Sequence, residues 1–238
     1  TNFSLSRDLW DWCAIRDKRL IYASSAATYG DGERGFEDDD SIDALSALYP
    51  LNAYGYSKRL FDEYAVRQAA EGHAPRQWAG LKFFNVYGPN EYHKGGMKSV
   101  VAQIWPKVAA GETVSLFRSH NPNYPDGGQL RDFVYVDDVV DIIDWLLATP
   151  QVNGIFNAGS GQARSFADLA RATFAAAGKE PSIAYVDMPE TIRDRYQYFT
   201  EARMDRLRAL GFPGQSTPLE EGVRRYVQGF LSQPDPYR

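Results

Sequence analysis

The sequence contains one cysteine, Cys13, in 238 residues, so no disulfide can form within the chain. A chain without disulfides fits a reducing compartment, and we expect a cytoplasmic protein. No apolar run approaches the roughly 18 residues that a membrane-spanning helix requires. The N-terminus also lacks the basic and then apolar pattern of a secretory signal. A membrane is therefore not among the expected partners.

Basic residues are not concentrated anywhere in the chain. The formal net charge is −5, and the 26 Lys and Arg residues are scattered, whereas a nucleic-acid-binding protein shows a basic patch. Nucleic acid is therefore not an expected partner. Metal is not expected either, because the acidic run EDDD at 37–40 has the pattern of a solvated turn.

A glycine-rich phosphate-binding turn is also missing. An α/β chain that binds a dinucleotide normally opens with a strand and a G-x-G-x-x-G turn, which receives the pyrophosphate of the dinucleotide. This chain opens instead with TNFSLSRDLWDWCAIRDKRL, which has the pattern of a crossover helix leading into a strand. We expect an N-terminally truncated fragment that lacks on the order of 80 residues, or two to three βαβ units of about 30 each.

What the sequence does contain is an alternation of short apolar runs and amphipathic segments, which predicts parallel strands joined by helices. Four runs predict strands, at residues 19–25, 80–88, 132–136 and 154–160. The expected fold is α/β, a doubly wound parallel sheet of Rossmann type that lacks its first strands, with a smaller mixed α/β lobe. We assign the remaining dinucleotide-binding domain to residues 1–88 and 130–161, and the substrate-binding lobe mainly to residues 89–129 and 162–238.

Local signals mark the ends of several helices. Ser165 to Asp168 and Thr217 to Glu220 each predict a helix start of the capping-box type. Gly178 and Gly211 stand where helix C-caps are expected. The Asn, Pro and Gly residues of 119–129 predict a loop.

The stretch YGYSK at residues 54–58 places a tyrosine and a lysine four positions apart near a predicted helix start. Helical spacing puts Tyr54 and Lys58 on one face, with a cation near a phenol. A nearby positive charge favours the ionised form of a phenol, which suits tyrosine to acid/base work. Upstream, YASSAATYG at 22–30 puts serines at the carboxyl end of a strand, where open α/β sheets bind ligands.

Together, Ser25, Tyr54 and Lys58 resemble the catalytic triad of the extended short-chain dehydrogenase/reductase superfamily, with FFNVYGP at 83–89 following in the superfamily's order and spacing. The resemblance implies that the tyrosine transfers the hydroxyl proton, the lysine assists it and binds the nicotinamide ribose, and the serine hydrogen-bonds the substrate oxygen. The chemistry agrees, because a carbinol that loses hydride to a nicotinamide must also lose its proton to a positioned base.

Further stretches resemble the ADP-glyceromanno-heptose 6-epimerase family of lipopolysaccharide core biosynthesis: residues 85–101, 116–119, 131–139 and 195–200. The resemblance runs from about residue 1 to the C-terminus. It implies an isomerase that converts ADP-D-glycero-D-manno-heptose to the L-glycero epimer through a transient 6-keto intermediate. It also implies bound NADP or NAD, with NADP favoured, and a homo-oligomer.

The same resemblance gives Lys94, in HKG at 93–95, the role of a second acid/base. Inversion at the exocyclic C6 by oxidation, rotation about the C5–C6 bond and hydride return moves the oxygen to a different wall of the pocket. One side chain serves both arrangements poorly, so Tyr54 and Lys94 make sense as a pair. A surface lysine between flexible residues is the alternative for Lys94.

Other site residues follow from the resemblance position by position. The cofactor contacts implied are Tyr54, Lys58, Lys94, Val86 and Asn2. The substrate contacts implied are Ser25, Asn85, Gly96, Gln103, Phe117, Arg118, Ser119, His120, Arg131 and Tyr196. Arg131 suits a diphosphate because its planar fork donates two hydrogen bonds to phosphate oxygens. Phe117 either stacks on adenine or ends a core strand.

The sequence departs from the family's pattern in places. Gly96 replaces a serine and Gln103 a histidine, and the loop at 119–129 is longer than in the compact form of the family, which shifts Ser119 and His120.

Two other functions stay open. A UDP-hexose 4-epimerase or a sugar 4,6-dehydratase would share the triad, although a dehydratase needs an acidic pair where Ala26 and Ala27 stand. A 4-epimerase gives no reason for Lys94. A catalytically inactive fragment that binds NAD(P) poorly is the second alternative.

Overall fold

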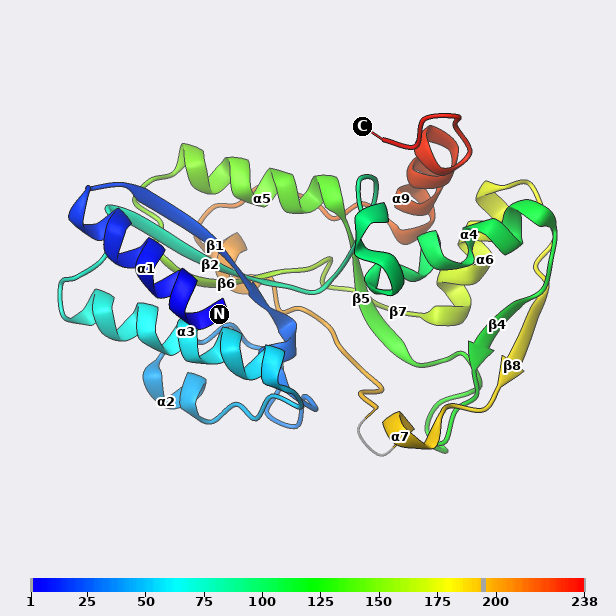
Figure 1. Ribbon diagram of the computed structural model, residues 1–238, viewed down its shortest axis with the longest axis horizontal. Coiled ribbons are helices and arrows are strands. Elements are labelled where there is room, and N and C mark those ends of the chain that lie inside the picture. Colours follow the sequence, from blue (N-terminus) through cyan, green and yellow to red (C-terminus); the bar gives the residue numbers. More distant parts are fainter. Residues whose placement is uncertain (1, 194–195, 238) are drawn as a thin grey trace. The chain divides into compact units, whose positions relative to one another are not determined.

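The strand predicted at residues 19–25 forms β1 (Arg19–Ser25), the first strand of a parallel sheet with β2 (Gln77–Phe83) and β6 (Gly154–Ala158) (Figure 1). The strand order is β1-β2-β6. The computed structural model describes residues 2–193 and 196–237. Within them, no helix is long and apolar enough to cross a membrane.

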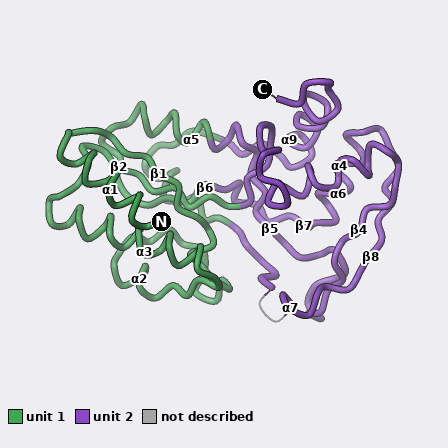
Figure 2. Tube along the Cα trace, viewed as in Figure 1, with its two compact units in different colours: residues 1–84, 140–158, 202–214 green, residues 85–139, 159–201, 215–238 purple. Residues whose placement is uncertain are grey.

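The chain divides into two units, each with its own core (Figure 2). The first unit comprises residues 1–84, 140–158 and 202–214, and the second residues 85–139, 159–201 and 215–238. The division places 85–88, 130–139 and 159–161 in the second unit and 202–214 in the first, which differs from the boundaries expected from the sequence. The assignment of cofactor and substrate binding to the two parts stays a prediction.

Helices cover both faces of the parallel sheet in the first unit. The Trp78 ring of β2 lies 5.3 Å from that of Trp10 in α1, whereas the Gln77 side chain donates to the carbonyl oxygen of Leu146 in α5. Consecutive strand residues point to opposite faces, so this sheet is doubly wound as predicted. The other elements of the unit are α1 (Asn2–Ile15), the 3₁₀ helix η1 (Ala26–Tyr29), α2 (Ile42–Ser46), α3 (Ala53–Ala70), the greater part of α5 (Val136–Ala148) and α8 (Asp205–Ala209).

The second unit is a mixed α/β structure. Strand β5 (Leu130–Tyr135) pairs in parallel with β3 (Asn85–Tyr87) and antiparallel with β7 (Ala163–Ser165), while β4 (Val114–Phe117) pairs in parallel with β8 (Ile183–Val186). The helical elements are η2 (Tyr92–Met97), α4 (Val100–Ala110), α6 (Phe166–Ala176), α7 (Glu190–Arg193), α9 (Leu219–Tyr226) and the π-helix η3 (Val227–Leu231). Helices α4, α6 and α9 bury their apolar faces in one core with β5.

The single strand predicted at 80–88 is wrong, because the segment forms two strands separated by Phe84. Residues 79–83 pair with β6, whereas residues 85–87 pair with β5. The chain therefore stops pairing with β6 before Phe84 and begins pairing with β5 after it. Apolar residues continue through the break, so the sequence pattern shows one run.

The predicted helix ends are confirmed in all but one case. Ser165 and Asp168 form a capping box at the start of α6, and Gly178 and Gly211 follow α6 and α8 with positive φ angles of 67° and 97°. The capping role of Thr217 is wrong. Its hydroxyl and amide instead donate to Asp138 at 2.6 and 2.9 Å, and α9 begins after Pro218 without a side-chain cap.

The expected solvated turn at 37–40 is also wrong for two of its residues. Asp38 is buried and accepts a 2.9 Å hydrogen bond from the Asn157 amide. Asp40 forms a 2.7 Å ion pair with Arg206. The run thus fastens this loop to β6 and α8, where fixed donors replace water around the carboxylates.

Candidate active site

Helix α3 holds Tyr54 and Lys58 on one face, as the sequence predicts. Asn52 caps the helix, since its Oδ1 accepts a 2.8 Å hydrogen bond from the Gly55 amide. One turn apart, the Lys58 Nζ lies 5.8 Å from the centroid of the Tyr54 ring. Tyr54 is half exposed, at 50% of its accessible surface. The phenol is therefore free to meet a ligand while the lysine stands beside it.

The ammonium group of Lys58 is fixed by the neighbouring strand. It donates a 2.7 Å hydrogen bond to the carbonyl oxygen of Ala23 in β1. Partial burial lowers the pKa of Lys58, and the Asp62 carboxylate one turn further along α3 acts in the opposite direction. The hydrogen bond to Ala23 positions the Lys58 amino group at the carboxyl end of β1.

Ser25 lies at the same end of β1 as the first turn of α3. Its Oγ accepts a 3.1 Å hydrogen bond from the Ala27 amide and so caps η1. A Cβ atom on Gly55 would lie 2.6 Å from the Ala27 carbonyl oxygen, so α3 approaches η1 this closely because residue 55 is glycine. The structure thus brings the elements carrying Ser25, Tyr54 and Lys58 together, where α/β sheets bind ligands.

Asn2 also lies beside α3. Its side-chain amide donates to the Ser57 hydroxyl at 3.5 Å, and that hydroxyl donates to the Tyr54 carbonyl oxygen at 2.7 Å. Asn2 is exposed, and its expected contact with cofactor stays a prediction.

In the second unit, Lys94 lies on an exposed segment whose ends are held by one carboxylate. Glu91 is buried and accepts hydrogen bonds from the Ser99 amide at 2.6 Å and the Ser99 hydroxyl at 2.5 Å. Tyr226 of α9 donates to the same carboxylate at 3.0 Å. Gly95 has a φ of 55°, which turns the chain directly after Lys94. Lys94 therefore lies exposed on a loop whose two ends are joined by the hydrogen bonds between Glu91 and Ser99.

Gln103 holds the same loop from α4. Its Nε2 donates to the Lys98 carbonyl oxygen at 2.7 Å and to that of Gly96 at 3.3 Å. The structure thus joins Gln103, Gly96 and the Lys94 segment, three of the positions expected in the site. Glu91 escaped the sequence prediction because nothing local distinguishes it from a surface glutamate.

A pocket of about 300 Å³ gathers three of the expected substrate residues, Gln103, Phe117 and Tyr196. The Phe117 and Tyr196 rings meet edge to face with centroids 6.5 Å apart. The size and mainly apolar lining suit an aromatic ring system. The pocket is completed by Val100, Ile104, Ser115, Leu116 and Phe166.

Arg131 lies next to this pocket. Its guanidinium carbon is 5.2 Å from the Tyr196 ring centroid and 5.6 Å from that of Phe166. Burial lowers the pKa of Arg131, with the tyrosines opposing that shift. The guanidinium donates to the Leu130 carbonyl oxygen at 2.8 Å, its one hydrogen bond within residues 2–193 and 196–237, so most of its five donors remain for a ligand. An anion such as a diphosphate fits these donors.

Other residues that were expected to contact the substrate or cofactor do not line this pocket. Arg118 donates to the Tyr185 carbonyl oxygen, the Ser119 hydroxyl to that of Asn121, and the His120 amide to the Tyr198 hydroxyl. These bonds stabilise the 119–129 loop and its surroundings. Asn85 and Val86 lie on β3. Arg195, the first residue of the 195–200 stretch, lies outside the described residues.

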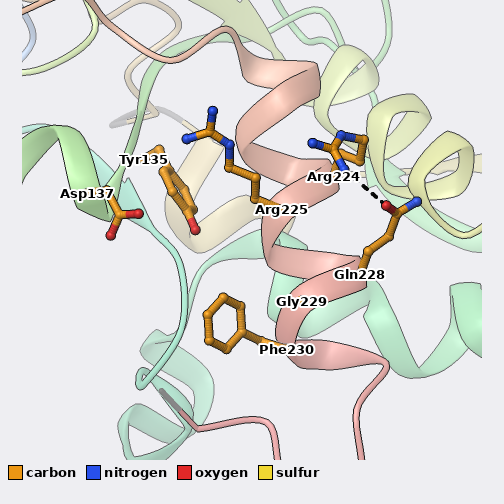
Figure 3. Close-up of a pocket in the computed structure, with 7 residues that line it drawn as sticks. All are labelled: Tyr135, Asp137, Arg224, Arg225, Gln228, Gly229 and Phe230. Carbon is orange, nitrogen blue, oxygen red and sulfur yellow. Dashed lines mark hydrogen bonds between the residues drawn. The ribbon is translucent and has the colours of Figure 1, made fainter.

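A second, more open pocket of the same unit lies along α9 (Figure 3). Its volume is about 460 Å³, and Arg224 and Arg225 project from α9 at its rim. Both arginines form ion pairs with Glu221, at 2.8 and 2.7 Å, so their charge is partly compensated. None of the residues expected in the site lines this pocket.

Known proteins resemble the chain over nearly its whole length. The profile of the NAD dependent epimerase/dehydratase family matches residues 1–159. An ADP-L-glycero-D-manno-heptose-6-epimerase of Nitratidesulfovibrio vulgaris is 51% identical over 236 residues, covering 99% of this chain and 71% of the relative. One from Fusobacterium nucleatum is 49% identical over 242 residues, covering 99% and 72%.

Solved structures give the same fold. The Helicobacter pylori ADP-L-glycero-D-manno-heptose-6-epimerase superposes with a TM-score of 0.76 at 27% identity, covering 98% of this chain and 66% of that one. The Thermus thermophilus UDP-glucose 4-epimerase, solved in complex with NAD, superposes with a TM-score of 0.72 at 28% identity, covering 94% and 67%.

Proposed function

Because the chain belongs to the NAD dependent epimerase/dehydratase family, we propose that it inverts C6 of ADP-D-glycero-D-manno-heptose to give ADP-L-glycero-D-manno-heptose. The observation that carries this choice is the exposed Lys94 on a loop closed by Glu91 and Gln103. A second positioned acid/base is what inversion at an exocyclic carbon requires. The two relatives near 50% identity bear the name of this activity.

The residues around Lys58 fit a nicotinamide ribose. The ammonium is held by one carbonyl at the carboxyl end of β1, which leaves its other protons for ribose hydroxyls. A bound nicotinamide dinucleotide supplies the acceptor and donor of hydride in this chemistry. The family is NAD-dependent, and NADP is the form we favour.

The proton transfers fall to two side chains. Oxidation of the C6 carbinol to a ketone releases a proton that Tyr54 or Lys94 accepts, with Ser25 hydrogen-bonding the substrate oxygen. Rotation about the C5–C6 bond turns the other face of the carbonyl to the hydride. The other side chain then donates the proton to the oxygen in its new place. The pair accordingly exchanges acid and base roles in the reverse direction.

The second unit supplies nucleotide recognition in this proposal. Phe117 and Tyr196 receive the adenine in the 300 Å³ pocket, and Arg131 binds the diphosphate. Arg118, Ser119 and His120 contact the ADP, and Asn85, Gly96 and Gln103 the sugar, while Val86 and Asn2 contact the cofactor. The residues around β1, β2 and β6 form the dinucleotide-binding part, and the lobe around β4 and β8 the substrate-binding part.

A UDP-hexose 4-epimerase is the alternative within the family, since it uses the same triad. The full-length gene product should be offered equal amounts of ADP-D-glycero-D-manno-heptose and UDP-glucose, with products separated by chromatography. We expect a new epimer of the ADP sugar and unchanged UDP-glucose. Formation of UDP-galactose alone would establish the alternative, and no product from either would support an inactive protein.

We further propose a homo-oligomer that works in the cytoplasm. The single cysteine suits a reducing compartment, and enzymes of this kind usually self-associate. Sedimentation velocity of the full-length gene product tests the first point, because a monomeric mass at micromolar concentration would contradict it.

A further inference from the structure

A lysine lies inside β2, a strand of the first unit that is buried at six of its seven positions. Lys82 of β2 is 1% exposed, and its Nζ lies 2.9 Å from the carboxylate of Asp62 in α3, which is fully buried. An ion pair removed from water in this way costs desolvation energy that its mutual attraction barely offsets. Replacing such a pair with apolar residues of similar volume is often neutral or stabilising, so stability alone does not account for the pair.

What the pair supplies is a set of directional bonds. The Lys82 Nζ also donates to the Thr28 hydroxyl at 2.7 Å and lies 5.0 Å from the Tyr29 ring centroid. The Asp62 carboxylate accepts hydrogen bonds from the Ser24 hydroxyl at 2.7 Å and the Tyr22 hydroxyl at 3.1 Å. Every bond has a fixed direction, so α3, β1, β2 and η1 are locked in one arrangement.

Three members of this network, Asp62, Ser24 and Thr28, lie close in the chain or by a hydrogen bond to residues of the proposed active site. Asp62 follows Lys58 by one turn of α3 and Tyr54 by two. Ser24 immediately precedes Ser25, and Thr28 donates a 2.8 Å hydrogen bond to the Ser25 carbonyl oxygen. The buried pair therefore connects the helix that holds two of the site residues to the strand end that holds the third.

We propose that the Asp62–Lys82 ion pair is a positioning element, which fixes the part of α3 that bears Tyr54 and Lys58 against the end of β1 that bears Ser25. The inference rests on the proposed function, because it assigns the pair to that reaction. Both residues are buried, so the proposed role is positioning and not contact with substrate or cofactor. Misplacement of reacting groups by about 1 Å lowers a rate by roughly 10²-fold.

Replacing one partner alone leaves a buried, unpaired charge and threatens folding. The test therefore combines Asp62→Leu with Lys82→Met in the full-length gene product, so that both charges are removed and the volume is kept. We expect a melting temperature at or above that of the wild type, kcat lowered roughly 10²-fold and KM unchanged. Lys82→Arg, which keeps the charge and the donors, should retain most of kcat.

The matched control is the Asp40–Arg206 pair, a 2.7 Å ion pair of the same unit that contacts none of the site residues. Asp40→Leu combined with Arg206→Met should leave kcat of the folded protein unchanged. A folded Asp62→Leu, Lys82→Met protein with wild-type kcat would overturn the proposal. Equal losses of kcat in the test and control variants would overturn it as well.

Failure of the proposed function is distinguishable from failure of the positioning role. If the unaltered protein epimerises no nucleotide sugar, the function fails, and the pair is then judged by a crystal structure of the double variant. Displacement of α3 against β1 by about 1 Å supports positioning. Superposition of Ser25, Tyr54 and Lys58 on the parent structure refutes it.

Discussion

In α3, the Nζ atom of Lys58 lies 5.8 Å from the centroid of the Tyr54 ring. A cation within about 6 Å of an aromatic face is attracted to it by roughly 0.5–1 kcal/mol at an exposed site. The bond from Lys58 to the Ala23 carbonyl keeps that cation in place. The phenol and the ammonium thus form one preorganised unit, from which the first prediction follows.

Tyr54→Phe should lower kcat for epimerisation by roughly 10²–10⁴-fold, because it removes a general acid/base and leaves the ring. The matched control is Tyr56→Phe, a change at an exposed tyrosine on the same helix. Steady-state kinetics on the full-length gene product provide the measurement. Equal rates for the two variants would remove Tyr54 from the mechanism.

Lys94→Met should cause a loss of the same order, because the second proton transfer then lacks its group. Lys98→Met is the control, since it changes the other lysine of the loop and keeps the backbone carbonyl that Gln103 binds. Both variants are compared by kcat in either direction of the reaction. Undiminished activity in Lys94→Met would eliminate the two-base mechanism.

Arg131→Lys should raise KM for the ADP sugar about tenfold or more and change kcat little. A hydrogen bond to a charged group contributes about 1.5–3 kcal/mol, and lysine lacks the planar fork that binds two oxygens at once. Arg171→Lys, on the exposed face of α6, provides the control. If KM is unchanged while ADP still competes with substrate, the diphosphate binds elsewhere.

The folded protein should lose stability in acid, in part because the Glu220 carboxylate becomes protonated. A hydrogen bond from Arg164 lowers the pKa of the Glu220 carboxyl in the folded protein. A depressed folded-state pKa contributes stability that is present above the unfolded value, about 4.3, and is lost as pH falls through the folded value. Glu220→Gln should therefore flatten the fall in melting temperature below about pH 5.

The effect of Glu220 is small, because the pair is largely solvated and screened. Glu112→Gln, at an exposed position in the turn between α4 and β4, is the control for a surface charge. Melting temperatures are measured by circular dichroism from pH 3 to pH 7. Parallel curves for Glu220→Gln and the wild type would show that the Arg164 contact contributes nothing.

The sequence predicted the elements whose pattern is local. Residues 19–25 form β1 with the expected bounds, and Ser165 and Asp168 form the expected capping box, because both depend on neighbours in the chain. Thr217 resembled a cap, yet its hydroxyl binds Asp138, a partner 79 residues away. The split at Phe84 depends on which strand pairs with which, and that information is not local either.

In the candidate active site too, only the features that depend on neighbours in the chain could be predicted from the sequence. The spacing of Tyr54 and Lys58 follows from helix geometry, so their proximity was predictable. Lys82 stands in the apolar run GLKFF, and a charge in a buried strand signals a partner without naming it. That Asp62 is the partner, and that Ser24 and Thr28 complete the network, depends on packing of α3 against β1 and β2.

The most direct test uses ADP-D-glycero-D-manno-heptose that carries deuterium at C6, incubated with the full-length gene product in ordinary water. Proton NMR follows the configuration at C6, and mass spectrometry follows the label. We expect the L-glycero epimer to accumulate with its deuterium retained, since the hydride removed from C6 returns to C6. An unchanged configuration at C6, or inversion with loss of deuterium to water, would contradict the account.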